Sequence, residues 1–149
     1  MDVLASAKGR DPRTRQGVMP MLSAAVVCLA LNIYHEARSE PLVGQVAVAN
    51  VVMNRVKDER FPNTICKVVK QRKSKTRCQF SWYCDGKSDK AHDKMAYKIA
   101  ITLAKHVING KELEDYTDGA VFYHADYVVP YWTKHFDKTK KIGTHIFYK

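Results

Sequence analysis

The stretch "LNIYHEARSEPLVGQVAVANVVMNRV", residues 31–56, decides the fold of this chain. An almost wholly apolar run, residues 21–33, leads directly into charged residues, and a second apolar run follows "SEP". The residue before Pro41 is disfavoured in helical geometry, so "SEP" should separate two helices. We therefore expect one helix over about 21–38 and another over about 41–57.

The second of these helices has apolar residues on every side, which is typical of a central, buried helix. Its β-branched residues would also suit a buried strand, but its length favours a helix. Asn50 and Asn54 share one face of the helix and need hydrogen-bond partners if they are buried. They could line the polar side of a cleft, either as structural braces or in contact with a substrate.

The rest of the chain predicts a mainly helical α+β fold with a small β or extended C-terminal part. A short helix should end near Gln71, with Asn63 or Thr64 as its cap. Residues 72–88 should form a long loop or a short hairpin. Ser88 or Asp89 should cap a helix that Gly110 stops after Asn109. The aromatic and β-branched tail predicts short strands.

The length of 149 residues suits one domain. Residues 1–19 are polar and aperiodic, so we expect a flexible lead-in followed by a single domain over 20–149. The net charge of +10 favours polyanionic partners such as nucleic acid, anionic membrane or cell-wall polymers, and charge alone does not choose among them. Lysines and arginines cluster at 70–77 and 134–141, and these clusters form either a solvated surface or a binding face.

Four cysteines, Cys28, Cys66, Cys78 and Cys84, permit three disulfide connectivities. Cys78 and Cys84 flank "QFSWY" and could close a small loop, whereas Cys28 lies inside the apolar helix and suits a buried thiol. We expect mostly free thiols.

The run 21–33, preceded by three arginines, has the length of a signal-peptide core. It is too short for an ordinary transmembrane helix, and no clear cleavage site follows it. A buried core helix is the better interpretation, so we expect neither an export signal nor a stable membrane anchor.

Glu36 has the features of a proton-donating acid. A carboxyl at the end of a buried helix is poorly solvated, and the C-terminal end of the helix dipole disfavours its anion. General acids in glycoside cleavage use such surroundings. The alternative is a surface ion pair with Arg38, Arg55 or a lysine. Glu40 is interpreted as a favourable charge at the start of the second helix.

The tail contributes Tyr123, His124, Tyr127, Tyr131 and Trp132. Such residues can line a groove in which sugar rings stack on aromatic faces, or they can be core and turn residues. Composition by itself favours the second interpretation.

Several segments in the right order resemble the SleB-type family of spore-cortex-lytic and cell-wall hydrolases. They are "IYHEARSEPLVGQVAVANVVMNRV", "RFPNTICKVVKQ", "QFSW", "FYHADYVVPYW" and "IGTHIFYK". The resemblance covers about residues 22–149. Ser39 stands where the family usually has glycine, a change that we expect to be tolerated.

The resemblance implies a compact lysozyme-like domain that cleaves peptidoglycan between N-acetylmuramic acid and N-acetylglucosamine. The implied chemistry is that of a lytic transglycosylase, with Glu36 as general acid and base and a 1,6-anhydromuramoyl product. The implied glycan groove contains Tyr123, His124, Trp132 and His145. Gln79, Phe80 and Ser81 would support that groove or bind an acetamido group.

If water attacked instead, a second carboxylate should assist, with Glu40 or Asp126 as candidates. The chain resembles a stand-alone lysin from a phage or another bacterial source. It is expected to act at the bacterial cell wall, in the periplasm or outside the cell. Since no clear signal peptide is present, a phage-encoded lysin would stay in the cytoplasm until it is released. We expect a monomer that needs no cofactor or metal and whose partner is the glycan strand.

Two other functions remain open. A zinc-dependent amidase could draw ligands from His35, His124, His145 and Asp126, but no paired short spacing is present. A basic nucleic-acid-binding module could use the lysines and arginines, but no known binding motif occurs, so no nucleic acid is expected.

Overall fold

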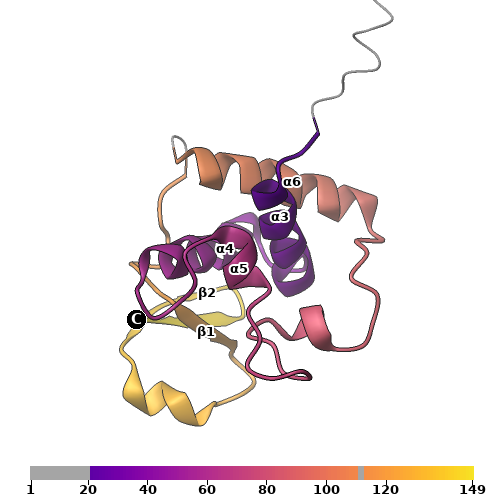
Figure 1. Cartoon of the computed structure of the whole chain (residues 1–149). Coiled ribbons are helices and arrows are strands. Elements are labelled where there is room, and N and C mark those ends of the chain that lie inside the picture. Colours follow the sequence, from indigo (N-terminus) through magenta and orange to yellow (C-terminus); the bar gives the residue numbers. More distant parts are fainter. Residues whose placement is uncertain (1–20, 111–112) are drawn as a thin grey trace, which may run out of the picture.

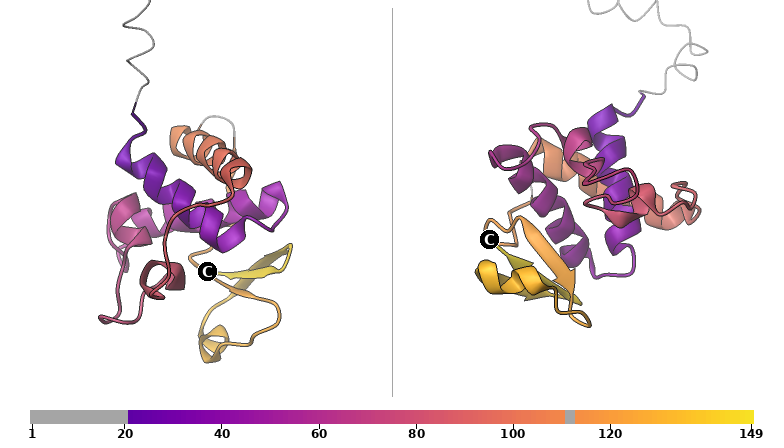
Figure 2. Two further views of the ribbon diagram at one scale, coloured as in Figure 1. Left: turned by 90° about the vertical axis from the view of Figure 1, so that its right-hand side faces the viewer. Right: turned by 60° about the horizontal axis from the view of Figure 1, so that its bottom comes forward.

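A computed structural model describes residues 21–110 and 113–149, and the lead-in expected over 1–19 lies outside them. A group of helices lies on one side of the molecule and a three-stranded sheet on the other (Figures 1 and 2). The mainly helical α+β class with a small C-terminal β part is confirmed.

Helix α3 spans Ala24–Ala37, three residues later than predicted at its N-terminus. Ser23 explains the difference, because its side chain accepts a hydrogen bond of 3.2 Å from the Val26 amide and so caps the helix. Helix α4 spans Leu42–Lys57, as the position of Pro41 predicted.

Helix α4 is the central element of the fold, as its sequence indicated. Val46, Ala49 and Val52 pack into the main core with α3, α5 and α6. On its other side, Ala47 and Val51 pack against the sheet. A helix between two packed layers needs apolar residues on both packed sides, which is why apolar residues occur all round this segment.

Two shorter predictions need correction at their ends. Helix α5 spans Ile65–Val69 with Thr64 as its cap, and it ends before Gln71. Helix α6 spans Lys94–Asn109 and begins later than predicted, because Asp93 caps it by accepting a hydrogen bond of 3.1 Å from the Ala96 amide. Gly110, at φ +65°, ends α6 as predicted.

The segment between α5 and α6 contains a 3-10 helix, η1, over Ser81–Cys84. The main chains of Arg72 and Cys78 form an isolated antiparallel bridge before it. The expected long loop or short hairpin is thus a loop closed by one bridge and one 3-10 turn.

The sheet contains β1 (Phe122–Ala125), β2 (Lys138–Ile142) and β3 (His145–Tyr148) in the antiparallel order β1-β3-β2. A second 3-10 helix, η2 (Tyr131–His135), lies between β1 and β2 in the chain. Tyr123 pairs with Phe147, so both point toward α4, and the residues on either side of them in each strand point away from it.

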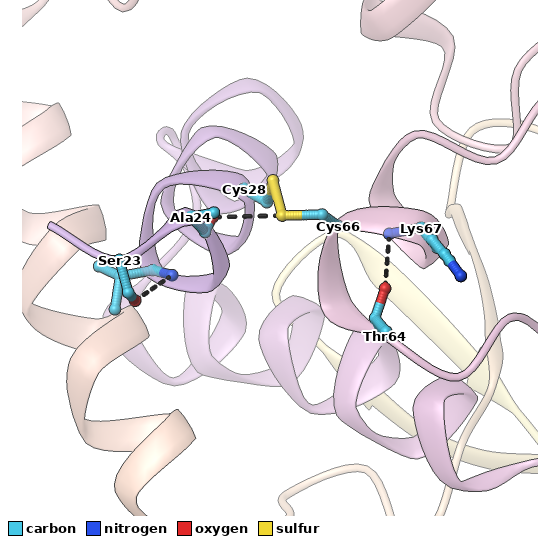
Figure 3. The surroundings of a disulfide bond; sticks show 7 residues. Ser23, Ala24, Cys28, Thr64, Cys66 and Lys67 are labelled. Carbon is cyan, nitrogen blue, oxygen red and sulfur yellow. Dashed lines mark hydrogen bonds between the residues drawn. A yellow bond between two sulfur atoms is a disulfide. The ribbon is translucent and has the colours of Figure 1, made fainter.

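The cysteines form two disulfides, Cys28–Cys66 and Cys78–Cys84, and the expectation of mostly free thiols is wrong. Cys28 was interpreted as an isolated core thiol, but α5 packs against α3 and brings the Cα atoms of Cys28 and Cys66 to 5.3 Å (Figure 3). This distance is normal for a disulfide. Cys78–Cys84 closes the small loop that the sequence allowed.

Asn50 and Asn54 brace the chain that leads from α6 to the sheet. Asn50 Oδ1 accepts a hydrogen bond of 3.1 Å from the Tyr116 amide. Asn54 Nδ2 donates to Asp115 Oδ2 at 2.9 Å and to the Ala120 carbonyl at 3.0 Å. These contacts set the entry to β1, so the structural interpretation of the pair holds.

Candidate active site

Glu36 lies in the last turn of α3, and a residue from the opposite layer of the fold holds its carboxyl. The hydroxyl of Tyr123 in β1 donates a hydrogen bond to Glu36 Oε1. The ring of Tyr123 is packed between His145 and Phe147, at centroid distances of 4.9 and 5.5 Å. The sheet therefore fixes the donor and the helix fixes the acceptor.

Burial raises the pKa of the Glu36 carboxyl above its ordinary value of 4.5. The hydrogen bond from Tyr123 and the charges of Arg55 and His35 oppose that rise. Burial and the nearby Glu36 raise the pKa of Tyr123 well above its usual range, so the phenol keeps its proton and remains a donor. Burial thus favours the protonated form of the Glu36 carboxyl, while Tyr123 and the nearby charges stabilise the form that has lost its proton.

Among the neighbouring positive charges, that of Arg55 in α4 has the largest effect on the pKa of Glu36. Arg55 is 4% exposed, and its Nε donates a hydrogen bond of 2.7 Å to the Val121 carbonyl, two residues before Tyr123. Burial lowers the pKa of Arg55 to about 10, and Tyr123 and Glu36 oppose that change. The guanidinium remains charged at neutral pH.

A cavity of about 370 Å³ gives access to Glu36. One wall comes from the end of α3 and the other from η1 and the segment after it. The lining residues are Tyr34, His35, Glu36, Arg38, Ser81, Trp82, Asp85, Lys87, Ser88, Lys90 and His92. A larger hollow of about 510 Å³ at the C-terminal end of α4 contains none of the predicted site residues.

The second wall of the cavity is anchored to α3 by polar and aromatic contacts. The indole of Trp82 stacks on His35 at 4.6 Å and donates a hydrogen bond of 2.8 Å to Asn32 Oδ1. His35 Nε2 donates to the Asp89 carbonyl at 2.7 Å. These contacts hold both walls of the cavity in place, so its shape is fixed by the fold.

The predicted "QFS" residues have three different surroundings. Ser81 lines the cavity with Glu36. Phe80 is buried, with its ring centroid 5.1 Å from the Arg55 guanidinium carbon, so it supports the site from the core. Gln79 is half-buried, and its main-chain amide donates to the Gln71 carbonyl at 2.9 Å.

The sheet separates the predicted groove residues. His145, like Tyr123, is on the face toward α4, whereas His124 is on the opposite face. There His124 contacts Trp132 and Tyr148 at centroid distances of 5.6 and 5.3 Å. His124 and Trp132 therefore belong to an aromatic cluster beneath the sheet and not to the wall around Glu36.

Glu40 lies just before the N-terminus of α4, as predicted, and its carboxylate also holds the turn between β2 and β3. Its Oε1 accepts hydrogen bonds from the amide and the hydroxyl of Thr144, at 2.8 and 2.7 Å. A side chain on Gly143, which has φ +58°, would lie 2.9 Å from the same oxygen. Pro41 occupies the cap of α4 without any side-chain hydrogen bond.

The proposed zinc ligands do not gather at one place. His35 donates to a backbone carbonyl, and His124 contacts the Tyr148 hydroxyl through Nε2 at 2.9 Å and the Ala125 carbonyl through Nδ1 at 2.7 Å. In residues 21–110 and 113–149, no group of three or more His, Cys, Asp or Glu side chains is arranged to hold a metal ion. Within the same ranges, no helix is both long and apolar enough to span a membrane.

A family sequence profile described as "Cell Wall Hydrolase" matches residues 39–148 of this chain. The chain belongs to the cell wall hydrolase family. The profile begins three residues after Glu36, so the role of this carboxyl depends on the surrounding geometry rather than on the profile.

Curated relatives of this cell wall hydrolase include two proteins called spore cortex-lytic enzyme. The one from Bacillus cereus is 35% identical over 122 residues, which are 81% of this chain and 42% of the relative. The one from Bacillus subtilis is 29% identical over 119 residues, 80% of this chain and 35% of the relative. The chain thus spans about two fifths of the length of these relatives.

Two solved structures share its fold. The catalytic domain of the germination-specific lytic transglycosylase SleB from Bacillus anthracis matches with a TM-score of 0.66 and 34% identity, over 89% of this chain and 100% of that domain. The catalytic domain of Bacillus cereus SleB matches with a TM-score of 0.63 and 31% identity, over 95% of this chain and 99% of that domain. The resemblance to the SleB-type catalytic domain is therefore confirmed.

Sequence reasoning did not assign two residues of this cell wall hydrolase to its site. Arg55 was considered only as a possible ion-pair partner, although an arginine in a helix with apolar residues on every side already indicated a buried charge. Trp82 forms the cavity wall, and nothing in its local sequence indicated that its ring would stack on His35.

Proposed function

We propose that this cell wall hydrolase is a lytic transglycosylase that cleaves glycan strands between N-acetylmuramic acid and N-acetylglucosamine, with Glu36 as general acid and base. The observation that carries the proposal is the Glu36 carboxyl itself. It opens to a cavity on one side and receives a buried tyrosine hydroxyl on the other. This arrangement supports a carboxyl that must give up a proton and take one back.

The reaction begins with Glu36 donating its proton to the glycosidic oxygen, and the bond from that oxygen to C1 of the muramic acid breaks. The N-acetylglucosamine leaves with the proton, and C1 develops oxocarbenium character. The C6 hydroxyl of the same muramic acid then attacks C1, and the ionised Glu36 accepts the hydroxyl proton. The product is a 1,6-anhydromuramoyl end, and the enzyme returns to its initial protonation state.

This route needs no second carboxylate, whereas attack by water would be helped by one. Glu40 is held by Thr144, and Asp126 forms an ion pair of 3.3 Å with Lys141. Asp85 is the other carboxylate that lines the cavity with Glu36. Asp85 therefore replaces Glu40 and Asp126 as the candidate base for a hydrolytic reaction.

The proposed substrate is peptidoglycan, and the proposed place of action is the bacterial cell wall. Ser81 and Trp82 are the residues that would meet the sugar beside Glu36, because both line its cavity. We keep the expectation of a monomer that needs no cofactor, and the expectation of a phage lysin stays a prediction. The germination role named for the Bacillus anthracis domain is not part of this proposal.

The test is mass spectrometry of the muropeptides released from purified peptidoglycan by the wild type, Glu36→Gln and Asp85→Asn. We expect anhydromuramoyl ends from the wild type and from Asp85→Asn, and at least a hundredfold less product from Glu36→Gln, since general acid catalysis contributes about 10²–10⁴-fold.

Other product patterns would contradict parts of the proposal. Reducing ends that disappear in Asp85→Asn would show a hydrolase with Asp85 as its base. Undiminished cleavage by a folded Glu36→Gln protein would exclude Glu36, and cleaved stem peptides would point to an amidase.

A further inference from the structure

A buried guanidinium without a carboxylate hydrogen bond requires an explanation, and Arg55 is such a group. Its residue is 4% exposed, and its Nη1 has no hydrogen-bond partner. Burying a charge is unfavourable unless nearby groups compensate. An arginine retained at the centre of the fold under these conditions suggests a task beyond packing.

Aromatic rings surround the Arg55 guanidinium. The centroids of Phe61, Phe80 and Phe122 lie 4.9, 5.1 and 5.8 Å from its central carbon. Ring faces stabilise a cation but do not neutralise it. The positive charge therefore acts on its surroundings with little screening by water.

Two contacts connect Arg55 to the reacting carboxyl. The hydrogen bond from Nε to the Val121 carbonyl fixes the main chain just before β1, the strand that places the Tyr123 hydroxyl on Glu36. The charge of Arg55 also acts directly on both Tyr123 and Glu36. Arg55 is 4% exposed and does not line the cavity around Glu36, so it acts on the reaction through Tyr123 and Glu36 and not by touching the sugar.

Resting on the proposed function, we propose that Arg55 is a positioning residue of the reaction. It holds the strand that carries Tyr123, and its buried charge favours the ionised Glu36 that proton donation leaves behind. A preorganised charge of this kind needs no rearrangement at the moment of reaction.

Other ionisable groups around Glu36 have to be separated from this effect. They lie on α3 and on the segment after η1, and they are His35, Arg38, Asp85, Lys87, Lys90 and His92. Arg38, Asp85, Lys87, Lys90 and His92 are exposed to water, which weakens their fields. His35, which is partly buried, stays unchanged in every variant below.

The experiment measures the pKa of the Glu36 carboxyl by carbon-13 NMR titration, with the signal assigned by its loss in Glu36→Gln. The neutral variants are Arg55→Met and Arg55→Gln, and Arg55→Lys keeps a charge. Arg60→Met is the matched control, because Arg60 lies 5.8 Å from the Phe61 ring and 5.7 Å from the Phe122 ring but is exposed and paired with Asp58.

We expect the neutral variants to raise the pKa of Glu36 by about one unit, as loss of a nearby opposite charge does. In a plot of kcat/KM against pH, the alkaline limb should shift to higher pH by the same amount as the pKa, since Glu36 must be protonated to act as an acid. We expect kcat to fall about tenfold while KM changes little. Arg60→Met and Arg55→Lys should leave the titration near that of the wild type.

An unmoved titration in a folded neutral variant would overturn the inference and leave Arg55 as a packing residue. So would loss of folding in both neutral variants with Arg55→Lys intact, because the charge would then serve stability. The NMR titration needs no substrate, so it is independent of the muropeptide test. If Glu36→Gln stayed active, the proposed function would fail even if Arg55 shifted the carboxyl as expected.

Discussion

At the scale of a single residue, burial of the Glu36 carboxyl serves the proposed reaction but destabilises the folded protein when the carboxyl is ionised. Burial is the largest influence on its pKa and raises it, while Tyr123 and Arg55 partly offset that rise. A carboxyl with a raised folded-state pKa stabilises the protein fully only below its unfolded pKa, near 4.5. This stabilisation is lost as the pH rises toward and through the folded-state pKa.

Glu36→Gln should therefore stabilise the protein at neutral pH while abolishing activity. Glutamine keeps an oxygen that can accept the Tyr123 hydrogen bond and carries no charge to bury. We expect a gain of about 0.5–2 kcal/mol at pH 7, similar to other stabilising changes at active sites. Below about pH 4 the gain should vanish, because Glu36 is then protonated in both the folded and the unfolded state.

Urea denaturation of the wild type and Glu36→Gln at pH 4 and pH 7 measures this difference. Glu59→Gln is the control, because Glu59 is an exposed carboxylate whose loss should change stability little at either pH. A gain that is equal at both pH values would contradict the assignment of the effect to ionisation.

At the scale of an element, the two disulfides have different tasks. Cys28–Cys66 joins α3 to α5 across 38 residues of sequence. Cys78–Cys84 closes a loop of only 6 residues around η1, which carries Ser81 and Trp82 into the cavity wall. The first therefore constrains the fold and the second constrains the site.

Replacing both cysteines of each pair by serine separates the two tasks. Loop-closure entropy predicts a loss of about 4 kcal/mol for the Cys28–Cys66 pair and about 2 kcal/mol for the Cys78–Cys84 pair. We expect the first double variant to keep the wild-type KM at a temperature where it is folded. The second should raise KM, because Ser81 is less restrained.

Denaturation curves and steady-state kinetics on soluble glycan fragments measure both effects. An unchanged KM in Cys78→Ser/Cys84→Ser would show that the contacts of Trp82 with Asn32 and His35 hold the wall without the disulfide. A larger loss of stability for the short loop than for the long one would contradict the entropic argument.

At the scale of the whole molecule, the net charge of +10 should hold the protein on an anionic polymer. Raising the salt concentration from about 0.01 M to about 1 M shortens the screening length from about 30 Å to about 3 Å. We expect retention on purified cell walls to fall strongly over this range. Turnover of a short, soluble glycan fragment should change much less, because such a fragment carries few charges and Glu36 is partly buried.

Sedimentation of protein with insoluble cell walls, followed by assay of the supernatant, measures that retention. Walls stripped of their anionic polymers are the matched control. Retention that is unaffected by salt and by stripping would assign wall binding to sugar contacts alone.

The sequence by itself determined the helical framework and indicated Glu36 as the candidate acid. Pro41 separated α3 from α4, apolar residues on all sides identified α4 as the central helix, and Gly110 marked the end of α6. These signals are local, because a helix is formed by residues three and four positions apart. Glu36 was identified for the same reason, since its place at the end of an apolar helix can be read from its neighbours.

Only the tertiary structure decided what surrounds Glu36. Tyr123 is 87 residues away and reaches the carboxyl through the pairing of β1 with β3. The same pairing places His124 on the opposite face, where Trp132 of η2 contacts it, and helix packing brings Cys28 to Cys66. A shift of one residue in the register of β1 would exchange the faces of Tyr123 and His124, and the register depends on contacts between distant residues that no short stretch of sequence contains.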